Sequence, residues 1–155
     1  MIRLAINGFG RIGRAAFKIA LSRASDLEVV AINDLTDNET LAHLLRYDTV
    51  YGRYGKEVTA TAQGIIIDKR EFPVYAEKNP AEIPWKSHRV DVVLECTGFF
   101  CSRDGAKAHL DAGAKQVIIS APGKGDDVPT YVVGVNHDLV NPGTEPIISN
   151  ASCTT

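Results

Sequence analysis

Short runs of apolar residues recur along the chain, at residues 2–6, 27–32, 90–95 and 116–120. Continuous apolar runs of this length are typical of strands that are buried on both faces of a parallel sheet. Between the first two runs, residues 11–24 place apolar side chains at the i, i+3, i+4 spacing of a helix. The repeated order of strand, helix and strand predicts an α/β fold, with a mostly parallel sheet and helices on both faces.

Capping residues mark two further helices. Asp37 can begin a helix that runs to about Arg46, because a carboxylate accepts hydrogen bonds from the free N–H groups of a first turn. Ser102 or Asp104 can begin another helix, and Gly113 suits the position just after its end.

The segments between these elements are less regular. Residues 57–75 contain short apolar or alternating pieces, which predict small strands in an antiparallel excursion from the sheet. Residues 47–55 are rich in glycine and tyrosine and are predicted to form a loop, and residues 79–85 a short helical turn. The last two strands are predicted at residues 131–135 and 146–149.

A glycine motif joins the first strand to the first helix. Gly8, Gly10 and Gly13 have the spacing G-x-G-x-x-G. The first glycine permits a tight turn, the second lets a pyrophosphate approach the backbone, and the third lets the helix pack on the strand. The phosphates would meet free N–H groups at the positive end of the helix dipole. Because the motif lies between a strand and a helix, it indicates a Rossmann-type nucleotide-binding unit rather than an ordinary turn.

An acidic residue ends the second strand of this unit. Asp34 follows Gly13 by 21 residues, the position from which a carboxylate accepts hydrogen bonds from an adenosine ribose. Its charge would repel a 2′-phosphate, and the neighbouring Leu35 offers no donor. The pattern therefore favours NAD over NADP.

Composition limits the classes of partner. The chain has 155 residues, 45% of them hydrophobic, which is enough for one domain with a core. A net charge of −2 gives no electrostatic case for nucleic acid or an anionic membrane, and no apolar run reaches the ~20 residues of a membrane span. The first residues enter a strand without a signal-peptide pattern, and an odd count of cysteines gives no disulfide framework. We expect a cytoplasmic protein.

Small or hydroxyl residues follow three other strands. Thr97, Gly98 and Ser120 stand at two of these strand ends, and residues 149–152 at the third. Ligands of parallel sheets bind beyond the carboxyl ends of the strands, so these residues could leave room for a cofactor. The alternative is that they form ordinary turns.

Cys153 follows the last predicted strand, between Ser152 and Thr154. If a helix begins there, its free N–H groups would favour the thiolate and could bind an oxyanion or a phosphate. A thiolate beside a nicotinamide suggests attack on an aldehyde, followed by hydride transfer to NAD that leaves a thioester. A small buried cysteine is the alternative reading.

The remaining cysteines and the histidines indicate no second site. Their spacing does not match the usual zinc patterns, so no metal is expected. Surface positions are predicted for His43, His88 and His109. His137 could lie near the site but has no evident partner, so a structural role is favoured, and no base for Cys153 can be named.

Residues 5–14, 31–34, 95–98, 120–122 and 149–155 together resemble the phosphorylating glyceraldehyde-3-phosphate dehydrogenase family, in order along the whole chain. The resemblance implies NAD as cofactor, glyceraldehyde 3-phosphate and inorganic phosphate as substrates, and a homotetramer. By position it implies that Cys153 is the nucleophile, which forms a hemithioacetal and then an acyl-enzyme. Ser152 and Thr154 would help to hold the substrate or phosphate.

The resemblance also implies a set of cofactor contacts at the strand ends. Arg11 and Ile12 would bind the pyrophosphate through backbone N–H groups, and Lys78 occupies a basic position that is usually arginine. The full set is Asn7, Gly8, Gly10, Arg11, Ile12, Gly13, Asp34, Lys78, Thr97, Gly98 and Ser120.

The family's enzymes are longer than this chain, which ends two residues after Cys153. Residues 1–150 are therefore expected to form the NAD-binding domain and residues 151–155 the start of a catalytic domain that would supply the base and the phosphate ligands. On this reading the chain alone binds NAD without turnover. Two alternatives are an erythrose-4-phosphate dehydrogenase, which shares the opening unit and the cysteine stretch, and a nucleotide-binding or interaction module without catalysis.

Overall fold

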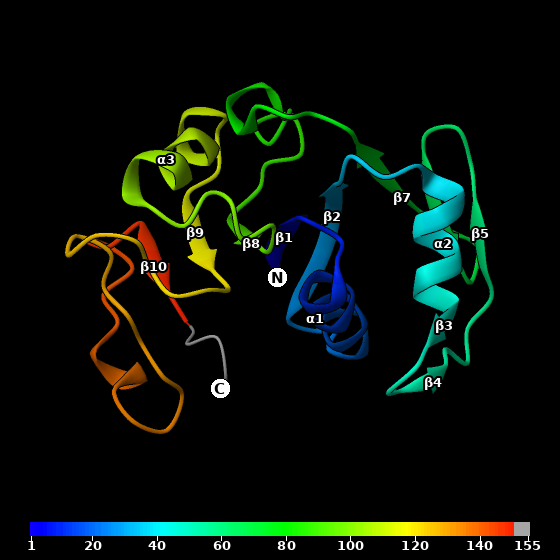
Figure 1. Ribbon diagram of the computed structural model, residues 1–155, viewed down its shortest axis with the longest axis horizontal. Helices are drawn as coiled ribbons and strands as arrows, with labels where there is room; N and C mark the ends of the chain where they lie inside the picture. The colour runs from blue at the N-terminus through cyan, green and yellow to red at the C-terminus, as the bar shows by residue number, and fades with distance from the viewer. Residues whose placement is uncertain (151–155) are drawn as a thin grey trace.

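A computed structural model of the protein describes residues 1–150 (Figure 1). Its centre is a sheet of eight strands in the order β10-β9-β8-β1-β2-β7-β6-β5. The strands that pair in parallel are β1 (Ile2–Asn7), β2 (Leu27–Asn33), β7 (Arg70–Tyr75), β8 (Val92–Glu95), β9 (Gln116–Ile119) and β10 (Ile147–Ser149). The predicted α/β, Rossmann-type fold is confirmed.

The antiparallel excursion is also present, and it belongs to the same sheet. Strands β5 (Val58–Ala60) and β6 (Gly64–Ile67) pair antiparallel, as do β6 and β7, whereas β7 then pairs in parallel with β2. The two residues between β6 and β7, Asp68 and Lys69, both have positive φ, at 48° and 75°. That geometry is the one that a two-residue hairpin turn requires.

Helices cover both faces of the sheet. Helices α1 (Arg11–Ser22) and α2 (Asn38–Arg46) lie on one face, where Phe17 and Leu41 share a buried cluster with Leu4 and Ile6 of β1. Helix α3 (Arg103–Asp111) and the short 3₁₀ helix η1 (Pro80–Glu82) lie on the opposite face, as Figure 1 shows for α3 beside β9. Buried apolar clusters therefore form on both faces of the sheet, because successive side chains of a strand point to opposite faces.

The predicted caps are confirmed. The Asp37 carboxylate accepts a hydrogen bond from the backbone N–H of Thr40 at 2.8 Å, and the Ser102 hydroxyl accepts one from the backbone N–H of Gly105 at 3.2 Å. Gly113, with φ at +105°, stands just after the end of α3.

The strand predicted at residues 131–135 is wrong. This segment forms turns that lead into the 3₁₀ helix η2 (His137–Leu139), and it is tied to the sheet mainly by the bridge between Thr130 and Ser149. The side chain of Asn136 accepts a hydrogen bond from Val132 N and donates one to Thr130 O. Such local side-chain bonds satisfy backbone groups that a strand would pair with a neighbour.

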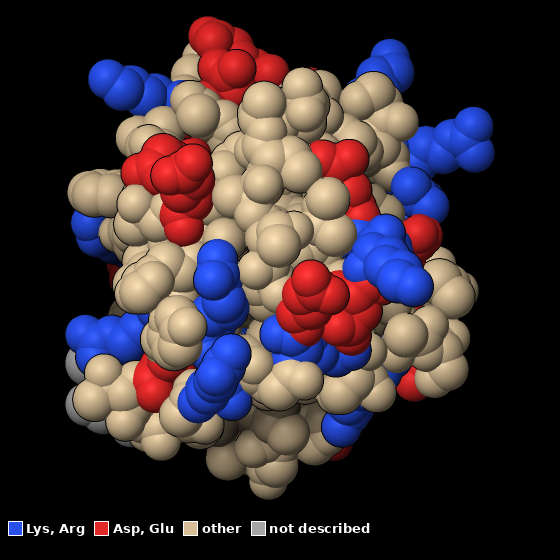
Figure 2. Space-filling view, turned by 90° about the vertical axis from the view of Figure 1, so that its right-hand side faces the viewer, with Lys and Arg blue, Asp and Glu red and all other residues tan. Residues whose placement is uncertain are grey.

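The predicted loop at residues 47–55 contains a small hairpin instead, with β3 (Tyr47–Asp48) paired antiparallel to β4 (Gly52–Arg53). Its tip is held because the Asp48 carboxylate accepts hydrogen bonds from the N–H groups of Val50 and Tyr51. On the face that includes α2 and β5, acidic and basic side chains are interspersed (Figure 2). Within residues 1–150, none of the helices has the length and apolar character that crossing a bilayer would require.

Candidate functional site

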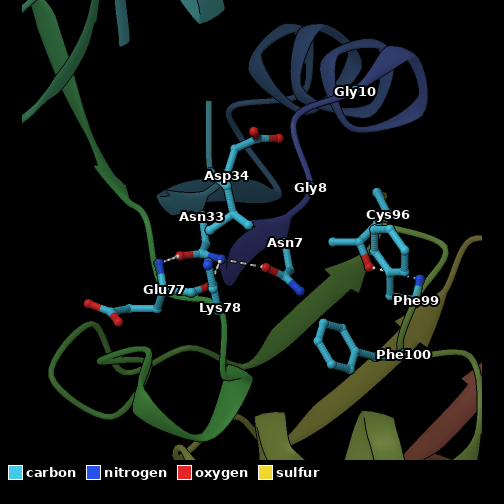
Figure 3. A pocket seen from close by; sticks show the side chains of 12 residues that line it. Asn7, Gly8, Gly10, Asn33, Asp34, Glu77, Lys78, Cys96, Phe99 and Phe100 are labelled. Atoms are coloured by element: carbon cyan, nitrogen blue, oxygen red, sulfur yellow. Dashed lines mark hydrogen bonds between the residues drawn. The ribbon is translucent and has the colours of Figure 1, made fainter. Parts of the chain in front are cut away.

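A pocket of about 320 Å³ lies at the carboxyl ends of β1, β2 and β8 (Figure 3). This is the edge of a parallel sheet at which ligands of such folds bind. The pocket is lined by residues from three strand ends and from the segment after β7: Asn7, Gly8, Gly10, Asn33, Asp34, Leu35, Glu77, Lys78, Cys96, Thr97, Phe99 and Phe100.

The three glycines of the motif have different local surroundings. A Cβ on Gly8, whose φ is +91°, would stand 2.7 Å from the backbone nitrogen of Thr97, and one on Gly13 would stand 2.0 Å from the carbonyl oxygen of Gly8. A Cβ on Gly10 would have no neighbour within 4 Å. Packing therefore demands glycine at the outer two positions, whereas at Gly10 the open space fits the close approach of a phosphate.

The first turn of α1 is free to bind an anion. Gly10 is its N-cap, so that no side chain caps the helix, and the first turn has no acidic residue. Arg11 and Ile12, both exposed, begin the helix beside the pocket. Unsatisfied N–H groups and the helix dipole favour a phosphate at such a position.

Asp34 connects the end of β2 to the glycine turn. Its carboxylate accepts one hydrogen bond from Phe9 N at 2.7 Å and another from Thr36 N at 2.9 Å. Arg14 holds the same turn from the other side, since its guanidinium donates to the carbonyl oxygen of Phe9 at 2.9 Å. The position of Asp34 is therefore set before any ligand arrives.

Buried polar side chains lie beneath the pocket. Asn7 and Asn33 are 1% and 4% exposed, and Asn33 donates to the side-chain oxygen of Asn7 at 2.8 Å. Asn33 also accepts a hydrogen bond from Glu77 N at 2.9 Å, so that it joins β1 to the segment after β7 (Figure 3).

The prediction that His109 lies at the surface is wrong. Its side chain is fully buried, and it accepts a hydrogen bond from Trp85 Nε1 at 3.0 Å and approaches Glu95 Oε2 at 3.0 Å. A signal was present in the sequence, because His109 follows the buried Ala106 by one helical turn. Polarity alone misled the prediction.

The other histidines differ in burial. His43 is exposed, as predicted. His88 is half-buried rather than at the surface, with Nε2 2.6 Å from the Tyr75 hydroxyl, and its carbonyl oxygen accepts a hydrogen bond from Arg3 Nε at 2.9 Å. His137 is exposed and accepts a hydrogen bond from Gly134 N.

Cys96 lines the pocket as a thiol of low reactivity. Its pKa is raised to about 11, mainly by burial and to a smaller extent by the negative charge of Glu95, while a hydrogen bond with Ser120 opposes the shift. The thiolate is the nucleophilic form of cysteine, so Cys96 is a wall of the pocket and not a nucleophile.

The predicted site residues are thus distributed in three groups. Asn7, Gly8, Gly10, Asp34, Lys78 and Thr97 line the pocket. Arg11, Ile12, Gly13 and Gly98 are adjacent to it in sequence, while Ser120, at the end of β9, is outside the lining. Ser152, Cys153 and Thr154 are outside the described residues 1–150.

Several lining residues were not predicted: Asn33, Leu35, Glu77, Cys96, Phe99 and Phe100. Most of them neighbour a predicted residue in the sequence, and adjacency to a strand end was the signal that could have found them. In the part of the chain that the structure describes, no group of three or more histidine, cysteine or acidic side chains is arranged to hold a metal ion.

The sheet, the glycine turn into an uncapped helix and the acidic end of β2 together define a Rossmann-type dinucleotide-binding domain. Residues 2–103 match the family model described as glyceraldehyde 3-phosphate dehydrogenase, NAD binding domain. The chain belongs to this family, and its cofactor is NAD.

Curated relatives support the assignment along the whole chain. Glyceraldehyde-3-phosphate dehydrogenase of Mycoplasma pneumoniae is 53% identical over 154 residues, which cover 99% of this chain and 45% of the relative. The enzymes of the same name from Kitasatospora aureofaciens and Thermotoga maritima are 54% and 53% identical, over 100% of this chain and 46% of each relative. The chain spans just under half the length of these relatives.

Proposed function

We propose that the chain is the cofactor-binding portion of an enzyme that oxidises glyceraldehyde 3-phosphate and phosphorylates it to 1,3-bisphosphoglycerate. The observation that carries the proposal is the open space at Gly10, in front of the uncapped N-terminus of α1. Family membership identifies the dinucleotide as NAD, and the names of the relatives point to the substrate. Those names favour glyceraldehyde phosphate over erythrose 4-phosphate.

In this proposal each wall of the pocket binds one part of the dinucleotide. The N–H groups of Arg11 and Ile12 bind the pyrophosphate, and Asp34 accepts hydrogen bonds from the adenosine ribose. Lys78 adds a positive charge from the segment after β7, and Thr97 and Gly98 contact the cofactor from the end of β8. When bound, NAD accepts the hydride that aldehyde oxidation releases.

The covalent step is assigned to Cys153. Its thiolate attacks the aldehyde carbon to form a hemithioacetal, and loss of hydride from that carbon leaves a thioester. An oxygen of inorganic phosphate then attacks the thioester carbon, and the thiolate departs as the acyl phosphate forms. Ser152 and Thr154 would hold the substrate or the phosphate during these steps.

The organisation of the protein follows from the same assignment. Residues 1–150 form the NAD-binding domain, and residues 151–155 begin a catalytic domain, which in the relatives would correspond to the remaining length. The intact enzyme is proposed to be a cytoplasmic homotetramer. The chain by itself is proposed to bind NAD without turnover, because the base that would activate Cys153 is assigned to the catalytic domain.

Cofactor preference tests the assigned role of Asp34. Calorimetric titration of the chain should show tighter binding of NAD than of NADP, by on the order of 1 kcal/mol or more, since the carboxylate repels a 2′-phosphate. Asp34→Ala should narrow this gap, and it should also weaken NAD because the glycine turn loses the acceptor for Phe9 N.

Glu39→Gln is the matched control, because it removes one exposed negative charge from α2, which is outside the pocket. The ratio of the two affinities should not change. Equal affinities of the unsubstituted chain for both cofactors would remove Asp34 from its proposed role. An assay of the chain with glyceraldehyde 3-phosphate, phosphate and NAD should give no NADH absorbance, and steady NADH formation would contradict the proposal that it lacks turnover.

A further inference from the structure

A buried carboxylate lies behind the pocket without lining it. Glu95, at the end of β8, is 1% exposed and accepts hydrogen bonds from four donors. One oxygen, Oε1, accepts from the backbone N–H of Thr97 at 2.8 Å and from the hydroxyl of the same residue. The other, Oε2, accepts from Asn7 Nδ2 at 2.6 Å and from His109 Nε2 at 3.0 Å.

The direction of the histidine bond follows from its other partner. Trp85 Nε1, which can only donate, lies 3.0 Å from His109 Nδ1. A ring nitrogen that accepts carries no proton, so the proton of His109 is on Nε2 and points at Glu95. Both oxygens of Glu95 therefore face donors, and a carboxylate is the only side-chain group that can accept from all of them.

On one side of the pocket, Glu95 determines the shape of the turn after β8. The Thr97 hydroxyl donates its hydrogen bond to Glu95, so its oxygen can accept one from Phe99 N at 3.1 Å. Between them, Gly98 has φ at +77°. The turn that carries Thr97 and Phe99 into the pocket is thus held by one carboxylate oxygen.

On the other side, Glu95 determines which way two amides point. Because Asn7 Nδ2 must face Glu95, its Oδ1 faces Asn33 and accepts from Asn33 Nδ2 at 2.8 Å. The oxygen of Asn33 is then turned to the segment after β7, where it accepts from Glu77 N at 2.9 Å. Figure 3 shows Asn33 between its two partners. Asn33 Nδ2 also donates to the carbonyl oxygen of Glu77 at 3.0 Å. The chain of bonds therefore has a single direction, which Glu95 fixes at one end and the backbone of Glu77 at the other.

We propose that Glu95 is a positioning residue of the dinucleotide site, which fixes both walls of the pocket through Thr97 and through the Asn7–Asn33 relay without touching the cofactor. The inference rests on the dinucleotide-binding role proposed above. His109 and Trp85 complete the arrangement, because they place a fourth donor on Glu95 and close the network from the side of α3 and η1.

Glu95→Gln tests this proposal because it changes the polarity of the network with little change in shape. The new amide nitrogen must face a donor, either Thr97 N or the pair formed by Asn7 and His109. If Asn7 and then Asn33 rotate to compensate, the Asn33 amide is reversed against the backbone of Glu77, so that Glu77 N loses its acceptor and Glu77 O loses its donor. We expect the Kd for NAD to rise about tenfold or more, together with faster hydrogen exchange at Glu77 N–H, two side chains away from the substitution.

A compensating variant distinguishes positioning from general stability. With Glu95→Gln and Asn7→Asp together, the acid at position 7 accepts from the new glutamine, from Asn33 Nδ2 and from His109 Nε2, which lies 3.4 Å from the present Asn7 Nδ2. The direction of the relay is restored, so protection at Glu77 N–H should return. This protection, rather than NAD affinity, is the readout for the pair, because position 7 itself lines the pocket. Val117→Ala, a cavity variant in the core under α3, is the control that lowers stability without changing NAD affinity.

Several outcomes would overturn the proposal. One is an unchanged NAD affinity in folded Glu95→Gln, and another is a paired variant in which Glu77 N–H exchanges as fast as it does in the single variant. If Glu95→Gln fails to fold, hydrogen exchange in the paired variant is the test, and failure of that variant to fold or to protect Glu77 N–H counts against the relay. Hydrogen exchange at Glu77 N–H is measured without cofactor, so it tests the relay independently of NAD binding. A chain that does not bind NAD would therefore refute the proposed function but not the relay.

Discussion

Single residues in the glycine turn separate the requirements of folding from those of binding. A side chain at Gly13 would collide with the carbonyl oxygen of Gly8, whereas one at Gly10 would enter open space. The conformation of Gly10, with φ at −70°, is available to any residue. Two glycines of one motif are therefore expected to respond differently to substitution.

Gly10→Val should abolish detectable NAD binding while the free energy of unfolding changes by about 1 kcal/mol or less, because only the phosphate's place is filled. Gly13→Ala should cost roughly 1–3 kcal/mol of stability, since helix α1 must move away from the turn. Urea unfolding and calorimetric titration of both variants are the measurements. An unfolded Gly10→Val would show that this glycine is a folding residue.

Cys96 is expected to resist alkylation until high pH. Its pKa near 11 leaves only about 1% thiolate at pH 9, since each unit below the pKa lowers that fraction tenfold. Iodoacetamide labelling, mapped to Cys96 by mass spectrometry, should be negligible at pH 8 and rise steeply above pH 10. The same protein in urea supplies the control, with labelling already rapid near pH 8.5. Rapid labelling of folded protein at pH 8 would contradict the burial of this thiol.

At the scale of elements, the antiparallel excursion depends on a turn with an unfavourable residue. Asp68 and Lys69 both occupy the left-handed region, and Lys69 is a residue that rarely adopts it. Asp68 is supported there by an ion pair with Lys56 and by a bond from Glu57 N. Lys69 is therefore the residue of the turn at which strain can be relieved.

Lys69→Gly should raise the free energy of unfolding by about 0.5–1 kcal/mol, because glycine adopts a positive φ without steric cost. Asp68→Gly should raise the free energy of unfolding less than Lys69→Gly does, or lower it, because this substitution also removes the ion-pair partner of Lys56. Urea denaturation of both variants measures the difference. If the Lys69→Gly variant is less stable than the parent, the Lys69 side chain makes a contact that stabilises the fold by more than the backbone strain destabilises it.

At the scale of the whole molecule, polar groups at the amino-terminal edge of the sheet join distant segments. Asp91, just before β8, accepts a hydrogen bond from Arg3 N at 2.9 Å and one from Lys115 Nζ at 2.7 Å. The bond with Lys115, and next the bond from Arg3, lower the pKa of this carboxyl below its usual value. The carboxylate thereby connects β1, β8 and the segment before β9.

Stability should fall in acid partly through Asp91. Because the pKa is lowered in the folded state, the stabilisation is complete above the unfolded value near 4 and is lost as pH falls through the folded pKa. Asp91→Asn should cost about 1 kcal/mol or less at pH 7, since the pair with Lys115 is largely exposed and screened. The variant should then lose less stability than the parent between pH 5 and pH 2.

Urea unfolding across that pH range checks the expectation, with Asp126→Asn as a control that removes an exposed carboxylate from the loop after β9. Parallel stability curves for the parent and Asp91→Asn would exclude Asp91 as a source of the acid sensitivity.

The sequence by itself determined the elements whose signals are local. The order β1, glycine turn, α1, β2 and Asp34 is readable because apolar period, glycine spacing and an acidic strand end all lie within a short stretch. The caps Asp37 and Ser102 are readable for the same reason, since each bonds a backbone N–H three residues away. Thr97 and Lys78 were placed by resemblance to the family, and the structure brings both to the pocket.

Only the tertiary structure decided where polar side chains are buried. His109 is fully buried and Glu95 is nearly so, because each has polar partners on other elements. Glu95 on β8 is bonded to His109 on α3, 14 residues later in the chain, and to Asn7 on β1, 88 residues earlier. No local pattern records such a pairing, because a polar residue is stable in a core only when its partner arrives from elsewhere. The turn at residues 131–135 has a different cause, because the partners of Asn136 are only four and six residues away. The apolar composition predicted a strand, but local side-chain bonds to the backbone competed with it.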